Sequence, residues 1–425
     1  MYLFLVRAFN DIDHITPIVW KMSRDDYPVA VYCINPEYDV KSDYRLNYLK
    51  ELGVEVDLIY NHFDQNLGRL HRFMRRLMLR SFTAKKKLDG GRRQISSAFS
   101  RMLGKLTGAA GKLFYMLMRL MFYNENWAQN ILEQSDVKVL CFDWMRPNQF
   151  VGNVLLTAAK NRSIPTLALP HGVFIYTNDS IAIESRPMET FEKLNRYDYV
   201  IVQNQLYKQI MAKSGLAKTK IHLLGSARYC NEWIEQNKKI SPRKIIANSK
   251  NATKLKIVFM TTKVRWRVNA ERMLKTFEML SNYDGIELLI KPHTRTKKEA
   301  TLYERLPLAI VSDVSSVELC EWADVVMVIG SSIILEPLIQ GKPVLYLKYL
   351  HENTTLYEEF GACWTIQNEE ELKKALSLLQ ADKKTVPYSD EDVKRFISDI
   401  VNGGPQKRDV LKDYEQFIMN CAPAG

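Results

Sequence analysis

An aspartate and a histidine follow two apolar runs in the first half of the chain. Asp143 comes directly after residues 137–142, and His171 comes directly after residues 165–170, within the sequence Pro-His-Gly. If these runs are neighbouring strands of a parallel sheet, both side chains lie at one edge, on strands about 4.8 Å apart. A carboxylate and an imidazole there can act as base or nucleophile and as acid partner. The alternative is structural, with an aspartate that caps a helix and a histidine bonded to backbone.

Basic side chains follow two apolar runs in the second half of the chain, at 255–261 and 286–291. A basic loop after a buried strand is an arrangement that binds anions, and it suits a diphosphate or a nucleotide phosphate. A basic surface turn is the alternative. The residues that we assign to this anion site are Lys263, Arg265, Lys291, His293 and Arg295.

The most specific motif is GSSIILEPLIQG, which follows the apolar run at 324–330. Gly330 would let a ligand approach the backbone, and Ser331 and Ser332 offer hydroxyl groups beside the unbonded amides of a helix N-terminus. Glu336 is placed to reach a ribose diol from the same helix end. The structural alternative is an ordinary helix with a serine N-cap and a glycine after its last turn. It explains Ser331 but not the presence of Glu336 on an otherwise apolar helix.

Other polar residues also follow predicted strands, but with less specific patterns. Asn10, Asp11, Asp13 and His14 follow the first strand, where they face an acceptor or cap the next helix. Gly225 and Ser226 follow the last strand of the first half and either line a cleft or form a turn.

Short apolar runs rich in β-branched residues alternate with segments of helical spacing along the chain, which predicts parallel sheets wound with helices. A polar stretch at 235–254 interrupts this alternation. We therefore predict an α/β protein with two Rossmann-like, doubly wound domains that face a cleft. The expected units are a first domain at 1–234, a linker at 235–254, a nucleotide-binding domain at 255–388, and helices at 389–425 that pack back on the first domain.

Length and composition agree with this organisation. The chain has 425 residues, of which 46% are hydrophobic, enough for two cores. Its six cysteines are scattered without metal-ligand spacing, and the first residues lack the pattern of a cleaved signal, so we expect a reduced, cytoplasmic protein. No pair of acids stands out as a metal site, and we expect no metal and no cofactor other than the substrate nucleotide.

The segment 68–123 differs from its surroundings, because it contains fourteen basic residues and one acid, Asp89. Apolar residues recur between the charges at steps of three and four, so we expect a basic helical insertion in the first domain. Its basic face either contacts an anionic membrane or is solvated. Nucleic-acid binding is not expected, because no known reading motif is present.

Pro-His-Gly, KPHTR at 291–295 and GSSIILEPLIQGKPVL at 330–345 together resemble the GT-B glycosyltransferases of bacterial surface polysaccharide assembly. The resemblance covers most of the chain except 68–123. It is strongest to the group that includes Kdo transferases, sialyl- and polysialyltransferases, capsule synthesis proteins and CDP-glycerol glycerophosphotransferases. In that group a basic loop with a histidine and a serine pair hold a cytidine nucleotide, and a first-domain carboxylate carries the chemistry. These roles fall on His293, on Ser331 and Ser332, and on Asp143.

The resemblance implies transfer of a sugar, such as Kdo from a CMP-linked donor, to a lipid-linked glycan such as O-antigen or capsule. Asp143 would act as base or covalent nucleophile with help from His171, at the inner face of the cytoplasmic membrane. Glu336 matches the ribose-binding glutamate of UDP-sugar enzymes of the same fold, so a UDP or GDP donor stays open. The alternatives are a CDP-glycerol-type polyol-phosphate transferase, a UDP-sugar 2-epimerase and a non-enzymatic assembly subunit.

Overall fold

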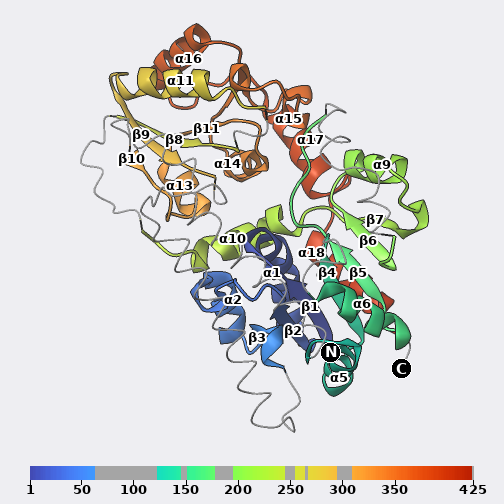
Figure 1. The fold of residues 1–425 in the computed structure, drawn as a ribbon. Coiled ribbons are helices and arrows are strands. Elements are labelled where there is room, and N and C mark those ends of the chain that lie inside the picture. The colour runs from blue at the N-terminus through green and yellow to red at the C-terminus, as the bar shows by residue number, and fades with distance from the viewer. Residues whose placement is uncertain are drawn as a thin grey trace, which may run out of the picture.

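The structure is a computed structural model that describes residues 1–62, 122–144, 151–177, 195–244, 254–263, 267–293 and 309–423. Two parallel sheets, one in each domain, form its core (Figure 1). Two predicted site residues, Arg265 and Arg295, lie outside the described residues. The predicted insertion at 68–123 also lies outside them, except for its last two residues.

The first sheet has seven parallel strands in the order β3-β2-β1-β4-β5-β6-β7. The strands are β1 (Tyr2–Val6), β2 (Val29–Cys33), β3 (Glu55–Leu58), β4 (Val139–Asp143), β5 (Thr166–Leu169), β6 (Tyr199–Val202) and β7 (Ile221–Leu223). Every residue of the two central strands β1 and β4 is buried, as expected for a parallel sheet covered on both faces.

Helices connect these strands in the way that the alternating pattern predicts. They are α1 (Phe9–Arg24), α2 (Tyr44–Glu51), α5 (Glu125–Gln134), α6 (Gly152–Asn161), α9 (Gln205–Lys213) and α10 (Asn231–Ile240), with the 3₁₀ turn η4 (Ala227–Tyr229) before α10. Helix α10 includes the first six residues of the segment predicted as a linker. Its buried residues, Trp233 and Ile234, make up a narrow face, which explains why the polar stretch shows little periodicity.

The second sheet has six parallel strands in the order β10-β9-β8-β11-β12-β13. The strands are β8 (Leu255–Met260), β9 (Ile286–Lys291), β10 (Ala309–Ile310), β11 (Val325–Val328), β12 (Val344–Leu347) and β13 (Trp364–Ile366). The helices of this domain are α11 (Ala270–Ser281), α13 (Ser316–Trp322), α14 (Leu335–Ile339), α15 (Leu356–Glu359) and α16 (Glu369–Ala381). In place of one continuous helix after the serine pair, the 3₁₀ turn η5 (Ser332–Ile334) precedes α14.

Two helices lead from the second domain back to the first, as predicted: α17 (Asp390–Val401) and α18 (Val410–Cys421) (Figure 1). Ser389 caps α17 by accepting a hydrogen bond from the amide of Asp392 at 3.1 Å. The carbonyl of Val401 accepts from the amide of Ser226 at 2.8 Å. Gly225 has a φ of +82°, and a Cβ there would lie 2.1 Å from that carbonyl oxygen, so this crossing requires glycine.

A second connection between the domains comes from the segment after β5. The carbonyl of Ile175 accepts from the amide of Leu356 at 2.8 Å, and the amide of Thr177 donates to the carbonyl of Thr354 at 3.0 Å. The hydroxyl of Tyr176 donates to the carbonyl of Gly330 in the second domain. The Pro-His-Gly segment therefore leads directly from the first sheet to the second domain.

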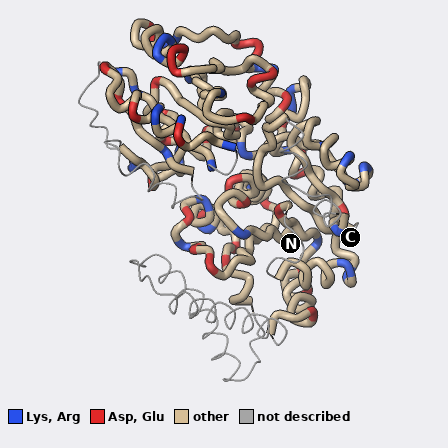
Figure 2. The backbone as a smooth tube through the Cα atoms, turned by 45° about the horizontal axis from the view of Figure 1, so that its top comes forward, with Lys and Arg blue, Asp and Glu red and all other residues tan. Residues whose placement is uncertain are grey.

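Acidic and basic residues occur on both domains in the described part of the chain (Figure 2). Within these residues no helix combines the length and apolarity needed to cross a bilayer. They also contain no group of three or more His, Cys, Asp or Glu side chains arranged to hold a metal ion.

Candidate active site

A cluster of four ionisable side chains lies at the carboxyl ends of β1, β4 and β5. The carboxylate of Asp143 accepts hydrogen bonds from Arg7, and its Oδ2 lies 3.3 Å from Nδ1 of His171. Arg7 also donates from Nε to Asp11 Oδ2 at 3.1 Å. Because Asp143 pairs with Leu169 in the register of β4 and β5, the predicted adjacency of these strands is confirmed.

The two members of the Asp143–His171 pair differ in exposure. The Asp143 side chain is 0% exposed, whereas the His171 side chain is 24% exposed. A substrate would have to displace the Arg7 guanidinium to reach the carboxylate. The partly exposed imidazole is therefore the more accessible member of the pair, and the catalytic roles expected of Asp143 and His171 stay predictions.

Asp11 completes the cluster as a second buried carboxylate. Burial and, to a smaller extent, the nearby charge of Asp143 raise the pKa of Asp11 to about 6, against the opposing effects of Arg7 and His171. Burial lowers the pKa of Arg7, but the two carboxylates outweigh this and hold it above its ordinary value. Arg7 therefore remains the cation between two acids, one of which titrates close to neutral pH.

A cavity of about 420 Å³ lies between the two domains, next to this cluster. The first turn of α1 separates the two features, because Phe9 and Asn10 line the cavity while Asp11 turns toward Arg7. The first-domain wall of the cavity includes Phe9, Asn10, Asp13, Tyr44, Arg228 and Tyr229. The second-domain wall includes Lys291, His293, Ser315, Ser316, Ser331 and Ser332.

The predicted anion site is only partly assembled in the second-domain wall. His293 lines the cavity, whereas Lys263 is buried and is not among the lining residues. Lys291 lines it but donates from Nζ to the carbonyls of Ser312 and Val314, both at 2.6 Å. Burial lowers the pKa of Lys291 to about 8. Two of its three N–H groups therefore hold the 312–314 loop in place, so its assignment as a phosphate ligand stays a prediction.

The serine pair lies where the motif places it, at the cavity surface. Ser331 Oγ accepts from the amide of Ile333 at 3.4 Å and so caps η5. Ser332 lines the cavity together with Tyr229 of the first domain. Both serines therefore line the cavity between the domains.

Gly330 lies at a contact between the two domains, and its expected role beside a ligand stays a prediction. Its φ is +46°, and a Cβ would lie 3.0 Å from Cε1 of His351 and 3.4 Å from Cε1 of Tyr176. Glycine is therefore required by the contact between the domains, with Tyr176 bonded to its carbonyl, and Gly330 is not among the residues that line the cavity.

Glu336 is buried one layer behind the cavity wall. Its Oε2 accepts from the hydroxyl of Ser316 at 3.3 Å, and Ser316 lines the cavity. Burial raises the pKa of Glu336 to about 7, although the charge of Arg228 opposes the rise. Contact between this carboxylate and a ribose therefore requires Ser316 to move or to mediate it.

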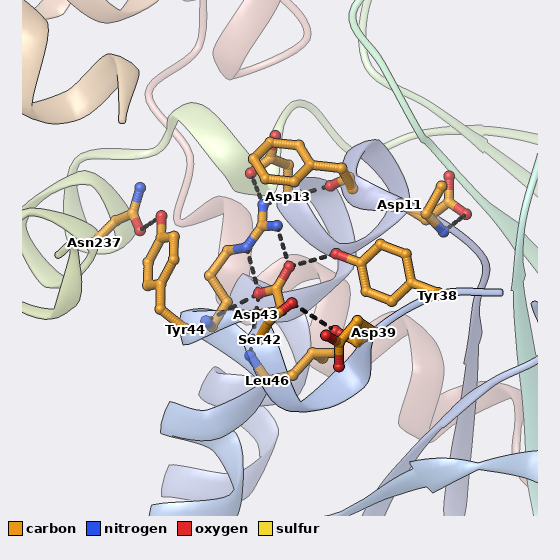
Figure 3. Close-up of polar contacts among 12 residues, drawn as sticks. Asp11, Asp13, Tyr38, Asp39, Ser42, Asp43, Tyr44, Leu46 and Asn237 are labelled. Atoms are coloured by element: carbon orange, nitrogen blue, oxygen red, sulfur yellow. Dashed lines mark hydrogen bonds and ion pairs between the residues drawn. The ribbon is translucent and has the colours of Figure 1, made fainter. Parts of the chain in front are cut away.

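The sequence gives no local signal for the ion-pair network that forms the first-domain wall. Arg45 pairs with Asp43 at 2.6 Å and with Asp13, and Asp13 also pairs with Arg228 at 3.0 Å. Figure 3 shows Asp13 and Asp43 converging from α1 and from the start of α2. The carboxylate of Asp13 is shared with partners 32 and 215 positions away in the chain, which no pattern of neighbouring residues could indicate.

Neither the known protein-family models nor the curated protein sequences match this chain. Solved structures match its fold. The UDP-GlcNAc 2-epimerase of Methanocaldococcus jannaschii, in complex with UDP-GlcNAc and UDP, is 16% identical, and the match covers 99% of each chain with a TM-score of 0.54. The HepE protein of Anabaena, in complex with UDP-glucose, is 10% identical over 99% of this chain and 98% of that chain, with a TM-score of 0.54.

A glycosyltransferase of Rickettsia africae also matches, at 12% identity over 99% of this chain and 98% of that chain, with a TM-score of 0.50. These similarities confirm the predicted fold, two Rossmann-like domains of the GT-B type. They do not support the narrower resemblance to the Kdo, sialyl and capsule transferases.

Proposed function

We propose that the chain is an enzyme that binds a UDP-sugar between its two domains and epimerises the sugar at C2. The main support is the cavity between the domains, which Ser331 and Ser332 line from one side and Arg228 from the other. A volume of about 420 Å³ is in the range of small-molecule sites. Hydroxyl donors and a cation on facing walls suit a ligand with a diphosphate in its centre.

Arg228 is the cation that we assign to the diphosphate. Burial lowers its pKa, but Asp13 outweighs burial and holds the pKa above the ordinary value, so the side chain stays charged. Its side chain is 20% exposed and pairs with Asp13 at 3.0 Å, which fixes the guanidinium in the wall. An arginine held in this way presents further N–H donors to phosphate oxygens at a small cost in side-chain entropy.

Two solved structures of similar fold support the choice of a uridine nucleotide, and one of them supports the choice of epimerisation. The Methanocaldococcus jannaschii epimerase and the Anabaena protein were both solved with uridine nucleotides. Those complexes favour a UDP-sugar over the CMP-linked donor expected from the sequence motifs. The Rickettsia africae enzyme makes transfer from a UDP-sugar the second candidate, since its match extends over the same share of this chain.

Because C2 of a UDP-sugar is not next to a carbonyl, removal of its proton has to be coupled to loss of UDP: the C–H electron pair forms a C1=C2 double bond as the C1–O bond breaks. Return of UDP to C1 and of a proton to the opposite face of C2 completes the epimerisation, so the cycle needs a base and an acid but no co-reactant.

We assign His171 to one of these proton transfers, because its Nδ1 lies 3.3 Å from the Asp143 carboxylate and its ring is partly exposed. Neither residue is among those that line the cavity, so the assignment requires the sugar to extend past the first turn of α1 to reach the imidazole. Asp11, with a pKa of about 6, belongs to the same cluster through its hydrogen bond with Arg7. Its charge therefore influences the protonation of His171.

Two measurements test the proposal. Calorimetry with UDP, CMP, CDP and GDP should show that UDP binds most tightly. Incubation with UDP-GlcNAc in D₂O, followed by NMR, should show a C2 epimer that carries deuterium at C2. Failure to bind UDP would overturn the proposal. Binding without exchange, combined with sugar transfer to an added acceptor, would replace epimerisation by transfer.

The variant His171→Asn should slow the exchange by about a hundredfold or more, as expected for loss of an acid–base group. His222→Asn is the matched control, because His222 lies on β7 and packs its ring 4.7 Å from that of Phe417, away from the cavity. Equal activities of the two variants would remove His171 from the mechanism.

A further inference from the structure

Phe9 is unusual because it leaves an aromatic ring exposed inside a cavity. Its side chain is one of three large hydrophobic side chains that are exposed in the described part of the chain, with Leu52 and Leu378. Their exposures are similar, at 39%, 40% and 41%. Of the three, Phe9 alone is among the residues that line the cavity. An apolar surface kept open in a ligand-sized cavity gains free energy when a ligand covers it.

The ring of Phe9 is held in position before any ligand arrives. The guanidinium carbon of Arg45 lies 4.1 Å from the ring centroid, within cation–π range. Arg45 also lies near the carbonyl of Phe9, to which it donates at 3.4 Å. The Arg45 side chain is 1% exposed and is fixed by Asp43 at 2.6 Å and by Asp13. One face of the Phe9 ring therefore rests on a rigid, charged support.

Polar side chains surround this aromatic surface. Asn10, Asp13 and Arg228 line the same wall, and they offer an amide, a carboxylate and a guanidinium. A pyranose ring has an apolar face made of C–H groups and a rim of hydroxyl groups that donate and accept hydrogen bonds. An aromatic face with planar polar groups around it matches both features.

A nucleobase would also stack on an aromatic ring, but it has fewer donors for the surrounding acceptors. Asp13 already accepts from Arg45 and Arg228, and its remaining lone pairs suit additional donors such as sugar hydroxyl groups. The serine hydroxyl groups of the second-domain wall and Arg228 meet in the same cavity, which places the phosphates between that wall and Phe9.

We propose that Phe9 is the platform on which the pyranose ring of the nucleotide-sugar stacks, with Asn10 and Asp13 bonded to its hydroxyl groups. The inference rests on the proposed binding of a UDP-sugar and adds the residue that recognises the sugar. The subsite takes a hexopyranose, and Phe9 contributes to affinity for the sugar without contributing to affinity for the nucleotide.

The test compares UDP with UDP-GlcNAc in calorimetric titrations of the full chain. Phe9→Ala should weaken UDP-GlcNAc binding about tenfold, equivalent to about 1.4 kcal/mol, and change UDP binding by less than about twofold. Phe9→Trp keeps an aromatic face and should restore most of the loss. Leu378→Ala removes an equally exposed side chain on α16 and should change neither affinity.

The outcomes separate this inference from the proposed function. Equal losses for UDP and UDP-GlcNAc in Phe9→Ala would assign the ring to the nucleobase and overturn the sugar platform. Unchanged affinities for both ligands would also overturn it, while the proposed function would stand. A wild-type chain that binds neither ligand would overturn both. Circular dichroism and the melting temperature of Phe9→Ala identify any loss caused by unfolding.

Discussion

The two walls of the cavity are built in different ways. The second-domain wall includes the loops that follow β9, β10 and β11, and several of its side chains are serine hydroxyl groups, such as that of Ser331, which bonds to nearby backbone. The first-domain wall is formed by helix starts and a 3₁₀ turn, and a network of four charged side chains supports it. The second-domain wall adapts to a ligand through rotation of its hydroxyl groups, whereas the first-domain wall holds rings and charges in fixed positions.

This difference matches the two halves of the proposed ligand. A nucleotide offers phosphate oxygens that accept bonds from rotatable hydroxyl groups and backbone amides. A sugar is recognised by shape and by the direction of several hydroxyl groups, which requires fixed partners. Arg45 provides that rigidity, because it is fully buried and contacts two carboxylates and the Phe9 ring.

The largest effect should come from removing the centre of the rigid wall. Arg45→Met leaves Asp13 and Asp43 without their shared cation, so we expect a loss of about 3–5 kcal/mol in the free energy of unfolding. Urea denaturation measures the change.

Arg24→Gln is the control for this prediction, because Arg24 pairs with Glu232 at 3.2 Å on the surface, and it should cost less than about 1 kcal/mol. Adding Asp13→Asn and Asp43→Asn to Arg45→Met should recover much of the loss. If Arg45→Met cost no more than Arg24→Gln, the first-domain wall would not be the rigid one.

A smaller effect is expected from Glu336, behind the second-domain wall. Its pKa rises from 4.5 to about 7 through burial, although Arg228 and Lys238 oppose the rise and Asp13 adds to it. The folded state therefore binds the proton more tightly than the unfolded state. The stabilising contribution is complete below pH 4.5 and is lost as the pH rises to about 7.

Glu336→Gln removes this titration. The free energy of unfolding of the variant, relative to the wild type, should increase by up to about 3 kcal/mol when the pH is raised from 5 to 8. Urea denaturation at both pH values measures this difference. Ser316→Ala, which removes the hydroxyl bonded to Glu336, serves as the comparison because it leaves the carboxyl group in place. A variant that is less stable than the wild type at pH 8 would show that Glu336 is ionised and paired with Arg228.

The smallest effect should come from a single hydroxyl group of the second-domain wall. Ser332→Ala should weaken UDP binding about threefold to tenfold, as expected for one hydrogen bond, and change stability by less than about 1 kcal/mol. Calorimetry and thermal melting measure the two quantities. Ser281→Ala, on α11, removes a hydroxyl that bonds only to the local carbonyl of Glu278 and should leave UDP binding unchanged. Full UDP affinity in Ser332→Ala would place the nucleotide elsewhere.

Local patterns were enough to predict several features of the fold and the site. The apolar runs predicted most strands of both sheets, because a parallel strand buried on both faces must be apolar throughout. They also placed Asp143 and His171 at one sheet edge, where the 3.3 Å contact joins them. The serine pair was located by its position after β11. Strand β13 was missed, because this edge strand buries only one of its three residues and so lacks a continuous apolar run.

The sequence by itself determined the two-domain α/β fold, the strand-end positions of Asp143, His171 and Ser331, and the concentration of positive charge in 68–123. That segment contributes +13, whereas the whole chain carries +12. Only the tertiary structure decided that Arg7 covers Asp143, that Gly330 serves a domain contact, and that Arg45 and Arg228 share Asp13. Strand patterns depend on near neighbours in the chain, whereas the burial of a charge depends on partners that folding brings from distant positions.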